Sequence, residues 1–366
     1  MTFCTSGREA LEHVHAQPFD VVVSDMRMPE MDGAELLAEI RRIHPDSIRI
    51  ILSGESDSGA IFRSMGVTHR FLDKPCDPAR LKETIELARV GPETLFADDS
   101  VASVLRYIDH LPMMPRLYGK LVERLRAGNA PAQEIGELIA QDVAMTAKVL
   151  QIVNSAAFSP RRPIERADRA VAYLGVERVK QLVLAAGVFE QFQGKIKPSW
   201  MDGIWHSSTR AAGLAERIAR DADADKDVVD AVSSAAMLHL TGRLILCSNF
   251  SERWDAAVKR SEREGVPLSL AETEEFDVRQ GPIGAHVLSL WGIPVRIVQA
   301  VAFHAKPMAA SEGYQEVATL AHAACALAED PTGAQIDLEP LRHAGLEGQV
   351  EIWRALAQEI GDEVEP

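Results

Sequence analysis

The sequence lacks the cysteine pattern of a structural metal site or a disulfide framework. Its four cysteines, Cys4, Cys76, Cys247 and Cys325, are widely spaced, and no two of them form a CxxC motif. A zinc ribbon needs closely spaced cysteine pairs, and a disulfide framework is typical of short secreted chains, so neither is indicated. Unpaired cysteines favour a reducing compartment, and we expect the protein to be cytoplasmic.

Long apolar runs and an excess of basic residues are also missing. No stretch approaches the roughly 20 apolar residues of a membrane-spanning helix, so we expect no membrane contact. Asp and Glu outnumber Lys and Arg by 54 to 39, for a formal net charge of −15. This charge argues against direct nucleic-acid binding. The short basic stretch SPRRPIER (159–166) is expected to be a solvated turn.

The 366 residues are long enough for more than one domain. Residues 1–90 alternate short apolar runs, beginning with TFC and FDVVVSD, with amphipathic helical patterns, which predicts a parallel α/β domain. Residues 91–105 combine Gly, Pro and acids and are predicted to be a linker. Apolar residues then recur three and four apart, which predicts an all-α bundle over 106–330 and a helical extension over 331–366.

Polar residues stand where three of the predicted strands end. Asp25 follows the run DVVVS, Ser53 follows IRIIL, and Lys74 follows HRFLD. Ligands gather at the carboxyl ends of parallel strands. The motif DMRMPEMDG, the serine and the motif FLDKP together resemble the receiver domain of two-component response regulators, which has a flavodoxin-like fold.

The resemblance implies a role for each of these residues. Asp25 would be the phosphoacceptor, a carboxylate that attacks phosphorus. Lys74 would contact the phosphoryl oxygens, and Ser53 would donate its hydroxyl to them. Phe71 matches the switch aromatic of the family. The phosphoryl donor would be a sensor histidine kinase, and a receiver can also form a homodimer through its last strand and helices.

The receiver pattern lacks its first strand. In the family this strand is central and ends in two acids that hold Mg²⁺, and Glu9, Glu12 and Asp20 fall on the wrong elements to replace them. We therefore expect a Mg²⁺ cofactor only where that strand is restored, and we interpret Met1 as an internal start. The edge of the DVVVSD strand would be uncovered and open to pairing with another chain.

The helical part resembles an HDOD domain, a relative of the HD phosphohydrolases that generally lacks their full set of metal ligands. The landmarks are LPMMP (111–115), QDVAMTAKVLQIVNSAAF with Asp142, AVAYLG (170–175), WHSS (205–208), MLHLTGRLIL and GAHVLSLWGIP. Each motif is weak alone, but all of them occur in the order of the family.

The metal ligands of an active HD hydrolase are incomplete in this chain. His206 and His239 fit the first two histidine positions, but the aspartate that should follow the second is Leu240. The remaining positions hold Gln280, His304 followed by Ala305, and His322. A leucine binds no metal, and imidazoles without a bridging carboxylate do not neutralise the charge of an ion. We therefore expect no metal here, with His239 and His206 as hydrogen-bonded core histidines and His304 more exposed.

These features predict a signal-transduction response regulator with a phosphorylated receiver and a non-catalytic HDOD output that binds a downstream signalling protein. Two alternatives remain open. The helical domain could be a metal-dependent HD-type phosphohydrolase or cyclic di-GMP phosphodiesterase, against which Leu240 argues. It could also retain a nucleotide pocket as a non-catalytic receptor.

Overall fold

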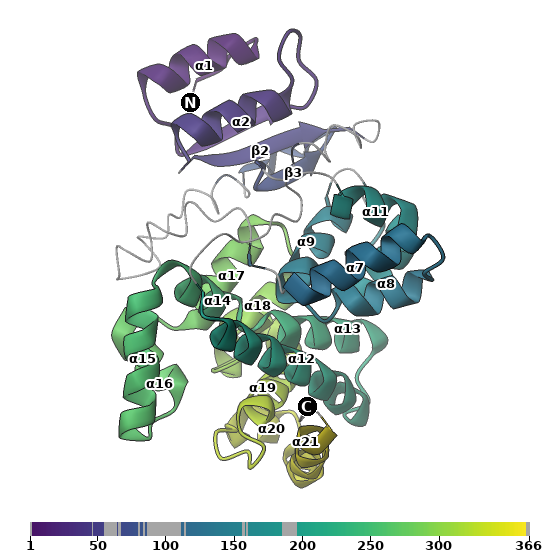
Figure 1. Cartoon of the computed structure of the whole chain (residues 1–366), viewed down its shortest axis with the longest axis vertical. Helices are drawn as coiled ribbons and strands as arrows, with labels where there is room; N and C mark the ends of the chain where they lie inside the picture. The colour runs from purple at the N-terminus through teal and green to yellow at the C-terminus, as the bar shows by residue number, and fades with distance from the viewer. Residues whose placement is uncertain are drawn as a thin grey trace.

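The protein is described here from a computed structural model, in which a small α/β unit precedes a larger helical domain (Figure 1). The structure describes residues 2–45, 47–54, 64, 67–79, 81–82, 85, 111–112, 115–155, 158, 160–184 and 196–363. The predicted helix GAIFRSMG (59–66, apart from Ser64), most of the predicted helix PARLKETIELARV (78–90) and the predicted linker (91–105) lie outside these residues.

The described sheet of the α/β unit has three parallel strands in the order β1-β2-β3. They are β1 (Val21–Asp25), β2 (Ile48–Ser53) and β3 (Arg70–Asp73). In register, Asp25 lies beside Leu52 and Ser53 lies beside Asp73. The strands therefore end together at one edge of the sheet, as the alternating pattern predicts.

Two helices, α1 (Gly7–Ala16) and α2 (Gly33–Ile43), pack against each other on the side of the sheet away from the helical domain (Figure 1). Ser6 caps α1 by accepting a hydrogen bond from the amide of Glu9. Asp32 and Glu35 form a reciprocal capping box at the start of α2. Local sequence signals therefore begin both helices.

The prediction of a strand over TFC was wrong, because residues 2–4 are not in a strand. An isolated segment cannot satisfy its backbone groups as a strand unless a neighbour pairs with it. Within the described sheet, the only neighbour of β1 is β2.

The larger domain is helical throughout its described residues. Its helices are α7 (Pro115–Ala127), α8 (Ala132–Ile139), α9 (Val143–Val153), α10 (Ala167–Leu174), α11 (Val176–Leu184), α12 (Pro198–Asp221), α13 (Lys226–Leu238), α14 (Thr241–Asn249), α15 (Ser251–Glu264), α16 (Leu268–Phe276), α17 (Gln280–Leu290), α18 (Val295–Phe303), α19 (Gln315–Glu329), α20 (Leu338–His343) and α21 (Val350–Glu363). Three 3₁₀ turns also occur, η2 (Pro307–Ala309), η3 (Glu312–Tyr314) and η4 (Glu347–Gln349).

Helix α13 lies at the centre of the bundle and packs against α9, α12, α18 and α19. The segment VDAVSSAAMLHLTGRLIL is not one continuous helix as its apolar periodicity suggested, because α13 ends at Leu238 and α14 begins at Thr241. The hydroxyl of Thr241 donates to the carbonyl of Leu238 across the break. His239 therefore caps a helix end instead of lying in the middle of a helix.

One helical stretch, Lys226–Asn249, passes a length and hydropathy test for crossing a membrane. Of its most apolar window, 89% is buried inside the fold, which is typical of a core helix.

Candidate functional site

The first candidate site lies at the carboxyl edge of the sheet, where the three predicted receiver residues meet. Lys74 and Asp25 form an ion pair, and the side chains of both are about two-fifths exposed. The amide of Lys74 donates to the carbonyl of Ser53 at 2.9 Å. The Ser53 hydroxyl is fully buried and has no hydrogen-bond partner among the described residues. The site therefore combines a reachable carboxylate, a cation and a spare hydroxyl donor.

The loop after Asp25 is held close to the strand end. The amide of Arg27 donates to the Asp25 carboxylate at 3.1 Å, and the amide of Gly33 donates to the carbonyl of Met26 at 2.9 Å. A Cβ atom on Gly33 would lie 2.3 Å from the carbonyl oxygen of Asp25, so only glycine fits there. Glu30 in the same loop has a φ of 66°, a left-handed conformation that favours glycine.

Phe71 lies on β3, three residues before Lys74, and is only 6% exposed. Its ring belongs to the hydrophobic core. Its role as a switch aromatic remains a prediction.

The residues described around Asp25 do not fit a Mg²⁺ ion. Magnesium is held by several oxygen ligands, usually including more than one carboxylate or phosphate. The Asp25 carboxylate is paired with Lys74, and the one described group of three potential ligands within reach of one another is Cys4, Glu9 and His13 on and before α1. The expectation that Mg²⁺ requires a further strand therefore remains a prediction.

The second candidate site is a cluster of polar side chains in the helical domain, which we call the histidine cluster: His239, Gln280, His304 and His322. The rings of His239 and His304 meet edge to face with centroids 5.4 Å apart. The Gln280 amide nitrogen lies 3.3 Å from His304 Nε2. His322 Nδ1 lies 2.7 Å from the carbonyl oxygen of His304. Four of the residues predicted from the HD pattern are thus neighbours.

Hydrogen bonds fix the protonation of these rings. The Nδ1 atoms of His239 and His304 donate to the carbonyls of Ala236 and Val301, at 2.6 and 2.8 Å. His322 Nδ1 donates to a carbonyl, and its Nε2 accepts from the amide of Asp337 at 2.8 Å. Since a carbonyl can only accept and an amide can only donate, these assignments follow from the partners. His322 is therefore neutral and has no nitrogen left for a metal, while His239 and His304 each carry a proton on Nδ1.

Burial also keeps the rings neutral. It lowers the pKa of His304 to about 4. Burial, followed by the charge of His304, lowers the pKa of His239 well below its ordinary value. The positive charge of Arg243 lowers both pKa values further. The positive charge of Arg243 also repels a divalent cation at this position.

Arg243 is the residue of this region that the sequence interpretation missed. It is 8% exposed, and its Nε donates to the Glu272 carboxylate at 2.9 Å, with Glu329 3.7 Å away. Leu240, at the position of the missing aspartate, is 3% exposed. The buried carboxylate is thus paired with a guanidinium and not with a histidine. An arginine within the apolar run LTGRLIL was the signal that could have revealed this ion pair.

The structure corrects the expected burial of one histidine. His206 is exposed on α12, so it is not a core histidine. His304 is less buried than His239, as expected, although the two rings lie against each other. The spacing of 33 residues between His206 and His239 matches the family pattern along the chain. It does not say whether each side chain faces the core or the solvent.

Other landmarks have structural roles. The buried Asp142 caps α9 by accepting from the amide of Met145 and also accepts from the indole of Trp205 at 2.7 Å. Asn154 donates to the Ile164 carbonyl and accepts from the Ile164 amide, which ties the loop before α10 to α9. Trp205, Trp254 and Trp291 are all at least 95% buried, as expected of packing residues.

Two family models match the chain. The response regulator receiver domain matches residues 1–86, and the HDOD domain matches residues 111–307, more than half of the chain. Among solved structures, the MmoQ response regulator fragment from Methylococcus capsulatus is 21% identical, with a TM-score of 0.51 over 65% of this chain and 92% of that chain. A virulence factor from Campylobacter jejuni is 23% identical, with a TM-score of 0.56 over 68% of this chain and 90% of that chain. These likenesses support the fold.

Relatives by sequence match only part of the chain. An uncharacterized protein of Treponema pallidum is 26% identical over 61% of this chain and 43% of its own length. The transcriptional regulatory protein GlrR of Escherichia coli is 38% identical over 24% of this chain and 21% of its own length. The chain thus spans less than half the length of the curated relatives it matches. The family matches nevertheless cover both parts of the chain, which belongs to the HDOD family and carries a receiver domain before the HDOD domain, the architecture of a signal-transduction response regulator.

Proposed function

We propose that Asp25 accepts a phosphoryl group from a sensor histidine kinase and that the HDOD domain is a non-catalytic output that binds a downstream signalling protein. The observation that carries the first half is the meeting of Asp25, Lys74 and the unpartnered Ser53 hydroxyl at one edge of the sheet. A phosphoryl group on Asp25 would take over the Lys74 charge and offer Ser53 the acceptor that it lacks.

Strand β3 provides a route from this site to the helical domain. Lys74 follows its last residue, Phe71 is buried within it, and the carbonyl of His69 just before it accepts from the side chain of Gln151 on α9 at 3.2 Å. The neighbouring Arg70 side chain reaches Gly292, in the turn after α17. A change in the Lys74 contact therefore acts on a strand that the HDOD domain holds at its other end.

A buried cation supports the proposal that the output is not catalytic. Arg243 occupies the region with Glu272, and its charge acts on His239 and His304. A hydrolytic metal would need a carboxylate where Leu240 contributes a hydrocarbon side chain.

Phosphorylation can be tested by labelling the full chain with acetyl phosphate and separating the products on a phosphate-affinity gel. Because phosphorylation of receivers depends on a bound metal, the same assay should include a version preceded by a strand that ends in two acids. We expect the version with the added strand to be labelled in the presence of Mg²⁺. We expect the label to be lost when Asp25→Asn is introduced into that version.

Asp20→Asn is the matched control, because Asp20 is an exposed carboxylate just before the other end of β1. It should be labelled as well as the unsubstituted chain. Labelling that survives Asp25→Asn, or its complete absence from both versions, contradicts the assignment of Asp25.

The hydrolase alternative predicts a different result. Purified protein incubated with Mn²⁺ or Fe²⁺ and cyclic di-GMP should release no linear dinucleotide if the domain is an output module. Turnover that disappears in His239→Ala and His304→Ala variants would overturn the non-catalytic assignment.

A further inference from the structure

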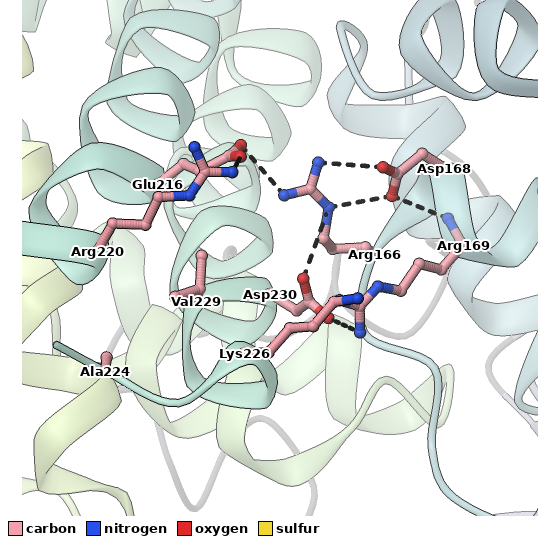
Figure 2. Close-up of a pocket in the computed structure, with 9 residues that line it drawn as sticks. All are labelled: Arg166, Asp168, Arg169, Glu216, Arg220, Ala224, Lys226, Val229 and Asp230. Carbon is pink, nitrogen blue, oxygen red and sulfur yellow. Dashed lines mark hydrogen bonds and ion pairs between the residues drawn. The ribbon is translucent and has the colours of Figure 1, made fainter.

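A charged cleft of about 500 Å³ lies between α10, α12 and the start of α13 (Figure 2). Its lining residues are Arg166, Asp168, Arg169, Glu216, Arg220, Ala224, Lys226, Val229 and Asp230. The cleft and the histidine cluster lie at opposite ends of α13, whose 13 residues span about 20 Å. A volume of this size is in the range of pockets for small organic ligands.

One wall of the cleft is built from a rigid ion-pair network around Arg166. Its guanidinium lies 3.0 Å from Asp168, 3.1 Å from Glu216 and 3.8 Å from Asp230 (Figure 2). These carboxylates come from α10, α12 and α13, so Arg166 ties the three helices together. These carboxylates neutralise the charge of Arg166. The side chain therefore shapes the cleft but is not available to bind a ligand.

The other cations of the cleft are less fully matched. Lys226 is exposed and forms no ion pair within the described part of the chain. Arg220 is 65% exposed and pairs on one side with Glu216, while Arg169 pairs with Asp230. Four cations thus face three carboxylates in a chain whose formal net charge is −15. A local excess of positive charge in an acidic protein favours an anionic ligand.

The backbone at the mouth of the cleft adds to this preference. Lys226 is the first residue of α13, and the residue before it, Asp225, makes no side-chain hydrogen bond to the first turn. The amides that open a helix attract phosphate through their partial positive charge. Arg162, from the basic stretch expected to be a solvated turn, lies 3.8 Å from Asp227 in the same turn. The exposed basic stretch thus lies beside the start of α13.

The ion pair between Asp230 and Arg169 is weakened when the Asp230 carboxyl takes up a proton. Burial raises the pKa of its carboxyl to about 6, although the charges of Arg169 and Arg166 oppose the shift. Near neutral pH, protonation of this group is thus within reach, and Arg169 can then turn to a phosphate. Ala224 and Val229 line the cleft with apolar surface.

We propose that this cleft binds a nucleoside diphosphate or triphosphate, with its phosphates on Lys226, Arg220 and Arg169 and its nucleoside against Ala224 and Val229. The cationic side chains and the helix start supply the phosphate contacts. The apolar surface and the volume accommodate a base and a sugar. A bare phosphate chain would leave this part of the cleft unfilled.

The proposal is tested by isothermal titration calorimetry of the full chain with ADP, inorganic pyrophosphate and adenosine at a constant ionic strength of about 0.15 M. We expect saturable ADP binding, weaker pyrophosphate binding and no adenosine binding. The double variant Arg220→Gln with Lys226→Gln should weaken ADP binding at least about tenfold, because two charge-assisted contacts are lost. It leaves the network around Arg166 with its carboxylates in place.

Arg217→Gln is the matched control, because Arg217 is exposed on the same helix as Arg220 but does not line the cleft. It should bind ADP within about twofold of the unsubstituted chain. No saturable ADP binding, or equal weakening in the double variant and the control, overturns the proposal and leaves the cleft as a structural clamp only. Pyrophosphate that binds as tightly as ADP overturns the nucleoside contact.

Discussion

Individual residues in this protein are held in conformations and charge states that they would not adopt alone. Glu30 adopts left-handed backbone angles in the loop after Asp25, and the Glu165 carboxyl is buried near Arg296 with an oxygen-to-Nε distance of 3.3 Å. Both situations cost free energy that the surrounding structure must offset. Each therefore gives a prediction that one substitution can test.

Replacing Glu30 by glycine should stabilise the receiver. A non-glycine residue in the left-handed region carries a steric cost of about 1 kcal/mol, which glycine avoids. We expect the free energy of unfolding in urea to rise by about 0.5–1 kcal/mol. Glu12→Gly, in the exposed part of α1, should instead lower it, because glycine weakens a helix interior. A loss of stability in both variants would contradict the strain at Glu30.

Replacing Glu165 by glutamine should change the pH dependence of stability. Burial raises the pKa of Glu165 to about 7, partly opposed by Arg296, whereas the ordinary value is 4.5. A raised carboxyl pKa favours the folded state below pH 4.5, and this contribution is lost as the pH rises through about 7.

Relative to the unsubstituted chain, Glu165→Gln should therefore gain stability between pH 5 and pH 8. After allowance for screening of this partly exposed group, the gain should be about 1–2 kcal/mol in urea unfolding. A difference between the two chains that stays constant over this range would show that the carboxyl does not titrate there.

At the scale of elements, the helices around the histidine cluster approach so closely that only glycine fits between them. A Cβ atom on Gly242 of α14 would lie 1.9 Å from the carbonyl oxygen of Gln280, at the start of α17. Gly284 on α17 approaches α14 in the same way. The cluster is thus positioned by backbone contact between two helices.

The variant Gly242→Ala should force these helices apart. We expect a loss of about 3 kcal/mol in the free energy of unfolding, because the obstructing atom is backbone and cannot rotate away. Gly213→Ala on α12 is the matched control, since nothing lies within 4 Å of its added Cβ. That control should leave stability unchanged or raise it by up to about 1 kcal/mol, and a similar loss in both variants would refute the close approach.

The receiver and the HDOD domain meet through β3 and α9. The contact includes the hydrogen bond from Gln151 to the carbonyl of His69, and Gln151 is 95% buried. Since β3 also leads to Lys74, the strand couples the two domains of the whole molecule.

Gln151→Leu should loosen this junction. The substitution removes this hydrogen bond between the domains, and a loss of about 1 kcal/mol corresponds to about fivefold faster hydrogen exchange of the amides in β3. Gln141→Leu is the control, because its side chain bonds within its own helical region to the carbonyl of Glu137. Equal exchange in β3 of both variants would argue against coupling through Gln151.

The two-part architecture and the sheet edge that carries Asp25 and Ser53 could be predicted from the sequence alone. Both depend on local patterns, namely strand and helix periodicity and polar residues directly after apolar strands, such as Asp25 and Ser53. Since parallel strands end at one edge, the order along the chain is enough to bring these residues together. The loss of the HD aspartate at Leu240 was also readable from the sequence.

The contacts between side chains that are distant in the sequence became known only from the tertiary structure. It placed His206 on the exposed side of α12, paired Arg243 with Glu272, and gathered cations from α10, α12 and α13 into one cleft. Helix periodicity fixes which residues share a face of one helix, but not which helix that face meets. That choice depends on packing of the whole bundle, including close approaches such as Gly242 against Gln280.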